Sequence, residues 1–221
     1  MPLALSAFQM IVICVVTDVC PALSLMLEKP EKDLLQKPPR SKNDHLVNWK
    51  LMIQAYLFIG LLQTIFSHLS FILYLQWYGH FRLDEIFLVF DKWTAGYKGY
   101  TGDQLNELLY TGQTITFSSL VLMQIFGNIY CTRTSVKSFF ESPPFVKRAR
   151  NIWLFVAQAV ALTLLMLIIF LPYVNNLFNT RQIPLEFFFI PLFYCLILVF
   201  CDEFRKVFVR NKIFYFHKLG W

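Results

Sequence analysis

Apolar positions along the chain form five long runs that are separated by shorter polar segments. A helix that crosses a bilayer needs about 20 mostly apolar residues, and each run reaches that length once its flanks are included. The pattern predicts transmembrane helices at about 2–27, 51–77, 108–131, 152–174 and 185–208. The third is the least apolar because it holds many Thr and Ser. We therefore expect an all-α, multi-pass helix bundle that forms one domain over residues 1–221.

The first run also has to be weighed as a cleaved signal peptide. It has no basic residue before its apolar stretch, and Asp18 interrupts that stretch. Both features differ from a secretory signal, which has a basic start and an uninterrupted apolar centre. We expect this run to be a retained span.

Composition agrees with a membrane protein. The 221 residues are 57% hydrophobic and 15% charged, whereas average globular chains carry about 45–50% apolar and 25% charged residues. This excludes a disordered tail and argues against a soluble domain. The five Cys residues lie in or beside apolar runs without metal-ligand spacing, so we expect neither a disulfide framework nor a bound metal cofactor.

The net charge of +6 is distributed unevenly among the connecting segments. If five spans alternate, segments 28–50, 132–150 and 201–221 share one side, and they hold sixteen of the 20 Lys and Arg residues. Cytoplasmic loops carry such an excess, which predicts an N-terminus outside and a C-terminus in the cytoplasm. Because these charges flank the spans and form no separate basic domain, we expect no nucleic-acid partner.

Asp18 is the main candidate for chemistry, because a carboxylate inside a span is costly and often marks an ion pathway. Pro21 removes a backbone hydrogen bond nearby. The Thr17 hydroxyl, the Asp18 carboxylate and the freed carbonyls are hard oxygen donors that suit a cation. Alternatively, Asp18 is a lone acid that reaches the membrane surface or pairs with a buried Arg. The sequence leaves both readings open.

The outer segment 78–107 is rich in aromatic residues. It could form an interfacial aromatic belt or a surface that docks a partner ectodomain. No phosphate-binding GxxxxGK[ST] loop, GxSxG elbow or HExxH motif occurs, and no polar segment is long enough to fold a soluble catalytic domain. We therefore expect no enzymatic activity from this chain alone and no cofactor in it.

Several residue strings, taken together, resemble the C-terminal membrane region of a known transporter family. They comprise Thr17-Asp18-x-x-Pro21-Ala22-x-Ser24-Leu25, then Leu46-Val47-Asn48, Ala55-Tyr56, Ile59-Gly60, Gln63, Thr101, Gln104, Thr111, Thr114, Gln124, Pro191 and Val199-Phe200-x-Asp202-Glu203-x-Arg205-Lys206. In this order they resemble transmembrane helices six to ten of P-type cation ATPases, especially the alpha subunits of sodium/potassium and proton/potassium pumps.

The resemblance implies a multi-pass protein of the plasma membrane that helps to carry a monovalent cation. It implies Asp18, Thr17 and Gln124 as cation-binding residues. The family hydrolyses ATP through a DKTG motif, which is not in this sequence, so Mg-ATP would act only through a complete pump. The family's acids at other positions of the ion site fall on Cys14, Gly127 and the Ala157–Val160 stretch, which hold no carboxylate.

In the resembled pumps a beta subunit docks on the outer loop. The corresponding stretch here contains Gly96, Tyr97 and Tyr100, which the resemblance implies as docking residues. Two functions stay open: the membrane part of a cation pump, or a non-catalytic assembly or regulatory protein that binds a pump alpha chain or a beta-like subunit. The missing acids favour the second, and the retained Thr17-Asp18-x-x-Pro21 string favours the first.

Overall fold

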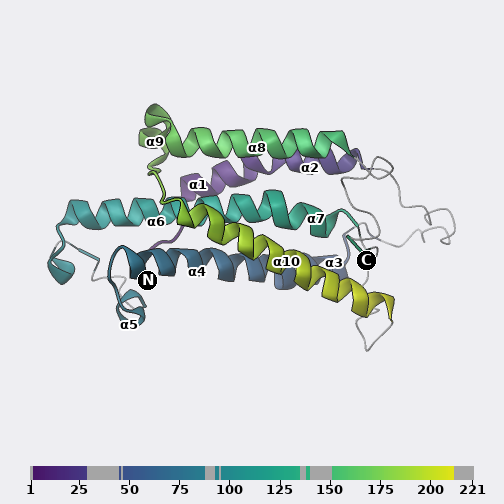
Figure 1. Ribbon diagram of the computed structural model, residues 1–221, viewed down its shortest axis with the longest axis horizontal. Helices are drawn as coiled ribbons and strands as arrows, with labels where there is room; N and C mark the ends of the chain where they lie inside the picture. The colour runs from purple at the N-terminus through teal and green to yellow at the C-terminus, as the bar shows by residue number, and fades with distance from the viewer. Residues whose placement is uncertain are drawn as a thin grey trace.

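The computed structural model describes residues 2–28, 45, 47–87, 93–94, 96–134, 138–139 and 151–211. These residues form helices and connecting turns, with no strand among them (Figure 1). Five helices are long and apolar enough to cross a membrane: Ala7–Met26, Trp49–Trp77, Gly102–Thr132, Ile152–Phe170 and Glu186–Arg210. The predicted all-α bundle of five spans is confirmed. The side of the membrane on which each terminus lies stays a prediction.

Each of the first three spans contains a π-helical segment, whereas the last two do not. The first span consists of α1 (Ala7–Val12), η1 (Ile13–Thr17) and α2 (Val19–Met26), the second of α3 (Trp49–Met52), η3 (Ile53–Gly60) and α4 (Leu61–Trp77), and the third of α6 (Gly102–Met123), η5 (Gln124–Asn128) and α7 (Ile129–Thr132). The fourth and fifth spans are α8 (Ile152–Phe170) and α10 (Glu186–Arg210). A π-helical turn changes which side chains face the neighbouring helices, and such turns are frequent at functional sites.

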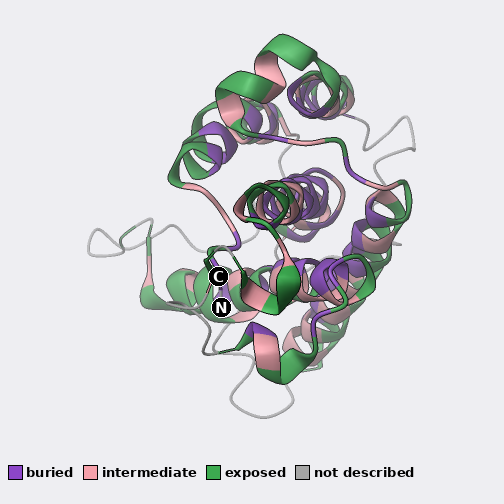
Figure 2. Cartoon of the chain, turned by 90° about the vertical axis from the view of Figure 1, so that its left-hand side faces the viewer, coloured by how far each residue is buried: buried purple, intermediate pink, exposed green. Residues whose placement is uncertain are grey.

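The third span lies in the centre of the bundle (Figures 1 and 2). In its most apolar stretch 72% of the residues are buried, against 28–39% in the other spans. On one side α6 packs against α4 and α10, while α2 packs against α8 (Figure 1). At the contact with α4, a methyl group on Gly112 would come within 2.7 Å of the Phe71 ring, so the missing side chain lets the two helices approach closely.

The third span is the least apolar of the five but also the most buried, because it is surrounded by the other helices. Small hydroxyl side chains let neighbouring helices approach closely, and each can bond its own helix backbone. Thr114 Oγ1 donates to Tyr110 O at 2.7 Å, Thr116 Oγ1 to Gly112 O at 3.0 Å, and Ser118 Oγ to Ile115 O at 3.0 Å. These three hydroxyls are thus satisfied within α6 and do not require water.

The helix of the third span begins at Gly102, whereas the apolar run placed its start at Leu108. Thr101 caps the helix, because its side chain accepts a hydrogen bond from the Gln104 N–H at 3.4 Å. The Gln104 side chain accepts one in return from the Thr101 N–H at 3.0 Å. This reciprocal cap extends the helix beyond its apolar part.

The helix of the fourth span ends at Phe170, before the predicted limit at residue 174. Pro172 has no N–H to continue the helical hydrogen bonds and biases the preceding residue toward an extended backbone. Leu171 is indeed extended, with ψ 116°, and a separate helix follows, α9 (Pro172–Phe178).

Polar side chains connect three spans at the end of the bundle where α2, α7 and α8 meet. Arg133 Nε donates to Glu28 Oε1 at 2.7 Å, and Asn151 Nδ2 donates to Glu28 Oε2 at 3.0 Å. Asn151 Nδ2 also lies 2.9 Å from Ser24 O, and Asn151 Oδ1 caps α8 by accepting from the Trp153 N–H at 3.1 Å. These contacts fix the relative positions of three helices that are distant in sequence.

Candidate functional site: a carboxylate and an amide between two spans

Asp18 and Gln124 meet between the first and third spans, each beside a π-helical segment. Asp18 follows η1, and Gln124 is the first residue of η5. Gln124 Nε2 donates to Asp18 Oδ2 at 3.1 Å. Two of the three predicted cation-binding residues are therefore in direct contact, although 106 positions separate them.

The pair leaves oxygen atoms available for a ligand. Gln124 Oε1 is buried and accepts no hydrogen bond from the described residues. In a regular helix the N–H of residue 21 would donate to the Thr17 carbonyl, but Pro21 has no N–H. The next N–H along, that of Ala22, donates to Asp18 O at 3.0 Å. The set thus consists of the Asp18 carboxylate, the amide oxygen of Gln124 and, one residue before Asp18, the Thr17 carbonyl. Hard cations prefer oxygen ligands of this type.

The third predicted residue, Thr17, is buried but uses its hydroxyl proton within its own helix. Thr17 Oγ1 donates to Ile13 O at 2.9 Å. The same carbonyl accepts the Asp18 N–H at 3.1 Å, which is the hydrogen bond that closes the π-helical turn. The structure thus gives the Thr17 hydroxyl proton a backbone partner, whereas the hydrogen bond of Gln124 goes to Asp18.

At two of the positions where the resembled pumps have an acid and this chain has none, the structure shows what takes the place of the carboxylate. A methyl group added to Gly127 would lie 3.3 Å from Leu198 Cδ1 and 3.6 Å from Cys195 Cα, so α10 takes the space of a side chain there. In the Ala157–Val160 stretch, Gln158 is buried and its Nε2 donates to Ile125 O in η5 at 2.8 Å. A neutral amide therefore faces η5 from α8. Gln158 is the single polar residue of this stretch.

Cys14 lies on the outer side of η1 and is exposed. Among the described residues, no group of three or more His, Cys, Asp or Glu side chains comes together. The candidate site therefore has one acid, Asp18, with an amide partner.

The described residues of segment 78–107, which is predicted to lie outside and is called the outer loop below, fold around the side chain of Phe81, which is 2% exposed. The rings of Tyr97 and Tyr100 lie 6.0 and 5.7 Å from it, centre to centre. Their hydroxyls donate to Glu85 O at 3.2 Å and to Gly79 O at 3.3 Å. Of the three predicted docking residues, the two tyrosines thus hold the loop together, and Gly96 is exposed with a φ of 96°.

An ion pair closes the same loop. Lys98 lies in η4 (Tyr97–Gly99), and its ammonium pairs with the carboxylate of Glu85 in α5 (Leu83–Ile86). The hydrogen bond from Lys98 is the main cause that lowers the pKa of Glu85 below its usual value. The same ammonium lies 5.5 Å from the centre of the Phe81 ring.

The sequence of residues 2–208 matches the family model described as "Cation transporting ATPase, C-terminus". The chain belongs to this family. Its similarity to individual pumps extends over almost its full length. It is 28% identical to potassium-transporting ATPase alpha chain 2 of Oryctolagus cuniculus over 222 residues, which cover 95% of this chain and 20% of that protein.

Two further relatives show the same extent of similarity. Sodium/potassium-transporting ATPase subunit alpha-4 of Rattus norvegicus is 28% identical over 221 residues, covering 96% of this chain and 21% of the relative. Potassium-transporting ATPase alpha chain 1 of Xenopus laevis is 27% identical, covering 95% and 21%. The resemblance to P-type ATPases is confirmed, and the chain corresponds to their C-terminal membrane region. It spans about a fifth of the length of these relatives.

Proposed function

We propose that this chain forms the C-terminal membrane part of a P-type, potassium-transporting kind of ATPase alpha subunit and lines part of its monovalent-cation pathway. The observation that carries the proposal is the contact between Asp18 and Gln124, together with the unpartnered Oε1 of Gln124. A fixed carboxylate offsets part of the cost of moving a cation out of water, and the amide oxygen replaces part of its hydration shell.

The hydrogen bond from Gln124 positions the carboxylate for this role. Because Nε2 occupies Oδ2, the other carboxylate oxygen of Asp18 can face an ion. The exposed side of η1, where Cys14 lies, would face the remainder of a pump, which would supply further ligands. ATP would be hydrolysed by parts of a pump outside the C-terminal membrane region that residues 2–208 match, so the isolated chain is proposed to have no ATPase activity. The plasma membrane is the proposed location.

A direct test measures how potassium affects the thermal unfolding of the full chain in lipid nanodiscs. Potassium chloride should raise the unfolding temperature relative to choline chloride at the same ionic strength, because a ligand that binds the native state stabilises it. Asp18→Asn should abolish the difference. Asp103→Asn is the matched control, because Asp103 is an exposed acid in the first turn of α6. Equal potassium effects in all three proteins would refute the proposed ion site.

The alternative function is a non-catalytic assembly or regulatory protein that binds a pump alpha chain or a beta-like subunit. It is favoured by the close packing of α10 on Gly127 and by Gln158, which together leave Asp18 as the single acid of the site. Affinity capture from native membranes separates the two proposals. Recovery of a beta-like subunit without vanadate-sensitive ATPase activity, combined with no potassium effect on unfolding, would support assembly over transport.

A further inference from the structure

The η5 segment, which begins at Gln124, departs from α-helical hydrogen bonding beside the candidate ion site. The Ile129 N–H donates to Gln124 O, whereas in an α-helix it would donate to Ile125 O. The Ile125 carbonyl therefore loses its α-helical donor, although this residue is only 1% exposed. A buried carbonyl that lacks a donor is costly, so a donor from another helix stabilises a π-helical turn at this position.

Gln158, on α8, supplies such a donor. Its Nε2 lies 2.8 Å from Ile125 O, and the residue is 6% exposed. Because a carbonyl oxygen can only accept, the nitrogen of the Gln158 amide has to face it. The other proton of Nε2 is directed to the hydroxyl of Tyr130, at 3.2 Å. The hydroxyl of Tyr130 in turn donates to Gln158 Oε1 at 3.4 Å, so both ends of the amide are held.

The helix that carries Gln158 packs against both π-helical segments of the ion site. α8 contacts η1, which precedes Asp18, and η5, which begins at Gln124. Figure 1 shows α8 lying along α2, the helix that follows Asp18. α8 is thus the common neighbour of the two segments that bring Asp18 and Gln124 together.

We propose that Gln158 is a positioning residue of the ion site, which holds η5 in its π-helical turn and thereby keeps the Gln124 amide on the carboxylate of Asp18. The inference rests on the proposed cation pathway at Asp18. Gln158 acts through the carbonyl of Ile125, the residue that follows Gln124. Relaxing the turn to an α-helix would change the angle between Gln124 and the helix after it by about 100°, one residue at 3.6 residues per turn. The amide would then leave Asp18 Oδ2.

Nuclear magnetic resonance of the full chain in lipid nanodiscs, labelled with isotope-enriched glutamine, tests this proposal. The side-chain amide signal of Gln124 is assigned by its loss in Gln124→Leu. Its contact with the carboxylate is recognised by the movement of the signal in Asp18→Asn. Gln158→Leu removes the donor but keeps a side chain of similar size that suits a membrane span. We expect it to move the Gln124 signal toward the position that the signal has in Asp18→Asn.

Potassium binding gives a second readout in the same samples. In Gln158→Leu the potassium concentration for half-maximal thermal stabilisation should rise about tenfold, the lower end of the effect typical for residues that orient the ligands of a metal ion. Tyr130→Phe frees Gln158 Oε1 but leaves the donor to Ile125, so it should shift both readouts in the same direction by a smaller amount.

Gln113→Leu is the matched control. Gln113 is also a buried amide of the third span, and its Nε2 donates to a backbone carbonyl of another segment, Leu3 O, at 2.9 Å. It lies in α6, outside η5. This variant should lower the unfolding temperature as Gln158→Leu does, but it should leave the Gln124 signal and the potassium midpoint unchanged.

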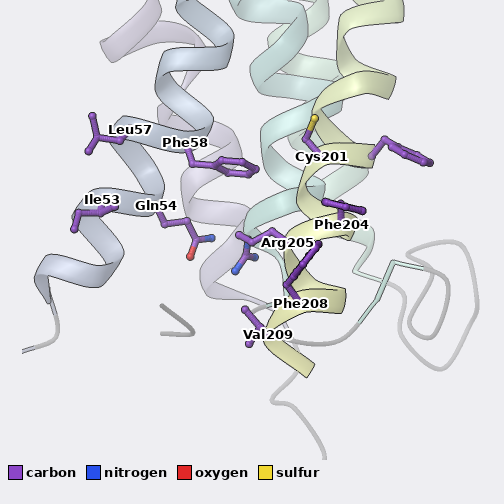
Figure 3. A pocket seen from close by; sticks show the side chains of 10 residues that line it. Ile53, Gln54, Leu57, Phe58, Cys201, Phe204, Arg205, Phe208 and Val209 are labelled. Carbon is purple, nitrogen blue, oxygen red and sulfur yellow. The ribbon is translucent and has the colours of Figure 1, made fainter. Parts of the chain in front are cut away.

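A second control changes the packing beside a different π-helical segment. The η3 segment borders a cavity of about 690 Å³ that it shares with α10 (Figure 3). The walls are mainly apolar and include Phe58 from η3 and Phe204 from α10. Phe58→Leu should leave both readouts unchanged, because the residues that hold η5 are not altered.

The contrary results are distinct. An unmoved Gln124 signal in Gln158→Leu, together with a lower unfolding temperature, would show that Gln158 only stabilises the fold and would overturn the proposal. Equal movement in Gln113→Leu would also overturn it, because any loosening of the span would then suffice. If potassium has no effect on the unaltered chain, the proposed ion site fails, whereas movement of the Gln124 signal in Gln158→Leu would still support the positioning of its contact with Asp18.

Discussion

Replacing Arg133 by Met should destabilise the bundle by about 3 kcal/mol. The side chain is 4% exposed, and its Nε lies 2.7 Å from Oε1 of Glu28, which is 16% exposed. Removing one member of a buried ion pair leaves the other charge uncompensated, which typically costs about 3–5 kcal/mol. The partial exposure of Glu28 and its remaining hydrogen bond from Asn151 place the expected value at the lower end.

The assay is unfolding of the detergent-solubilised chain by titration with sodium dodecyl sulfate, followed by circular dichroism. Arg82→Met is the matched control, because the pair of Arg82 with Asp84 is 3.5 Å long and mostly exposed. Such a surface pair contributes at most about 1 kcal/mol. The double variant Glu28→Gln/Arg133→Met should cost less than the sum of its single variants, because it removes both charges of the pair together. Strict additivity, or a cost of Arg133→Met below that of Arg82→Met, would refute the reasoning.

Three further predictions concern helix contacts and the outer loop. Gly112→Ala should cost about 1–3 kcal/mol by overpacking against Phe71, and adding Phe71→Leu should recover part of the loss in the same titration. The outer loop should open as the pH falls below about 4.5, the ordinary pKa of a Glu side chain. The pKa of Glu85 is lowered in the folded loop, so the charge that stabilises the loop is lost only when acid protonates it. Hydrogen exchange of the loop should show this opening, and Glu85→Gln should remove the pH dependence. Thr101→Ala should cost about 1 kcal/mol and speed hydrogen exchange in the first turn of α6 but not at its centre.

The five spans could be predicted because hydropathy is a property of contiguous residues. The boundaries required more than hydropathy, since the polar first turn of α6 depends on the cap at Thr101, and the end of α8 depends on Pro172. Both signals are present in the sequence as a Thr-x-x-Gln spacing and as a proline. Capping signals and prolines, read together with hydropathy, therefore locate these two helix ends more accurately than hydropathy alone.

The candidate ion site was partly predictable. Asp18 is conspicuous because it is the charge that interrupts an apolar run, and Gln124 was assigned through the resemblance to the pumps. The role of Gln158 was not predictable, because it depends on which part of another helix, the Ile125 carbonyl in η5, lies opposite its side chain. In the sequence, Gln158 is a single polar residue between apolar neighbours, and nothing in that pattern specifies the helix it contacts.

The sequence by itself determined that this chain crosses a membrane as five helices, that it carries one acid in its first span, and that it is related to cation-transporting ATPases. These properties depend on local composition and on the order of residues. Only the tertiary structure decided that the polar third span lies in the centre and that Gln124 contacts Asp18. These properties depend on how helices rotate and pack against one another, and neither hydropathy nor motif spacing specifies that arrangement.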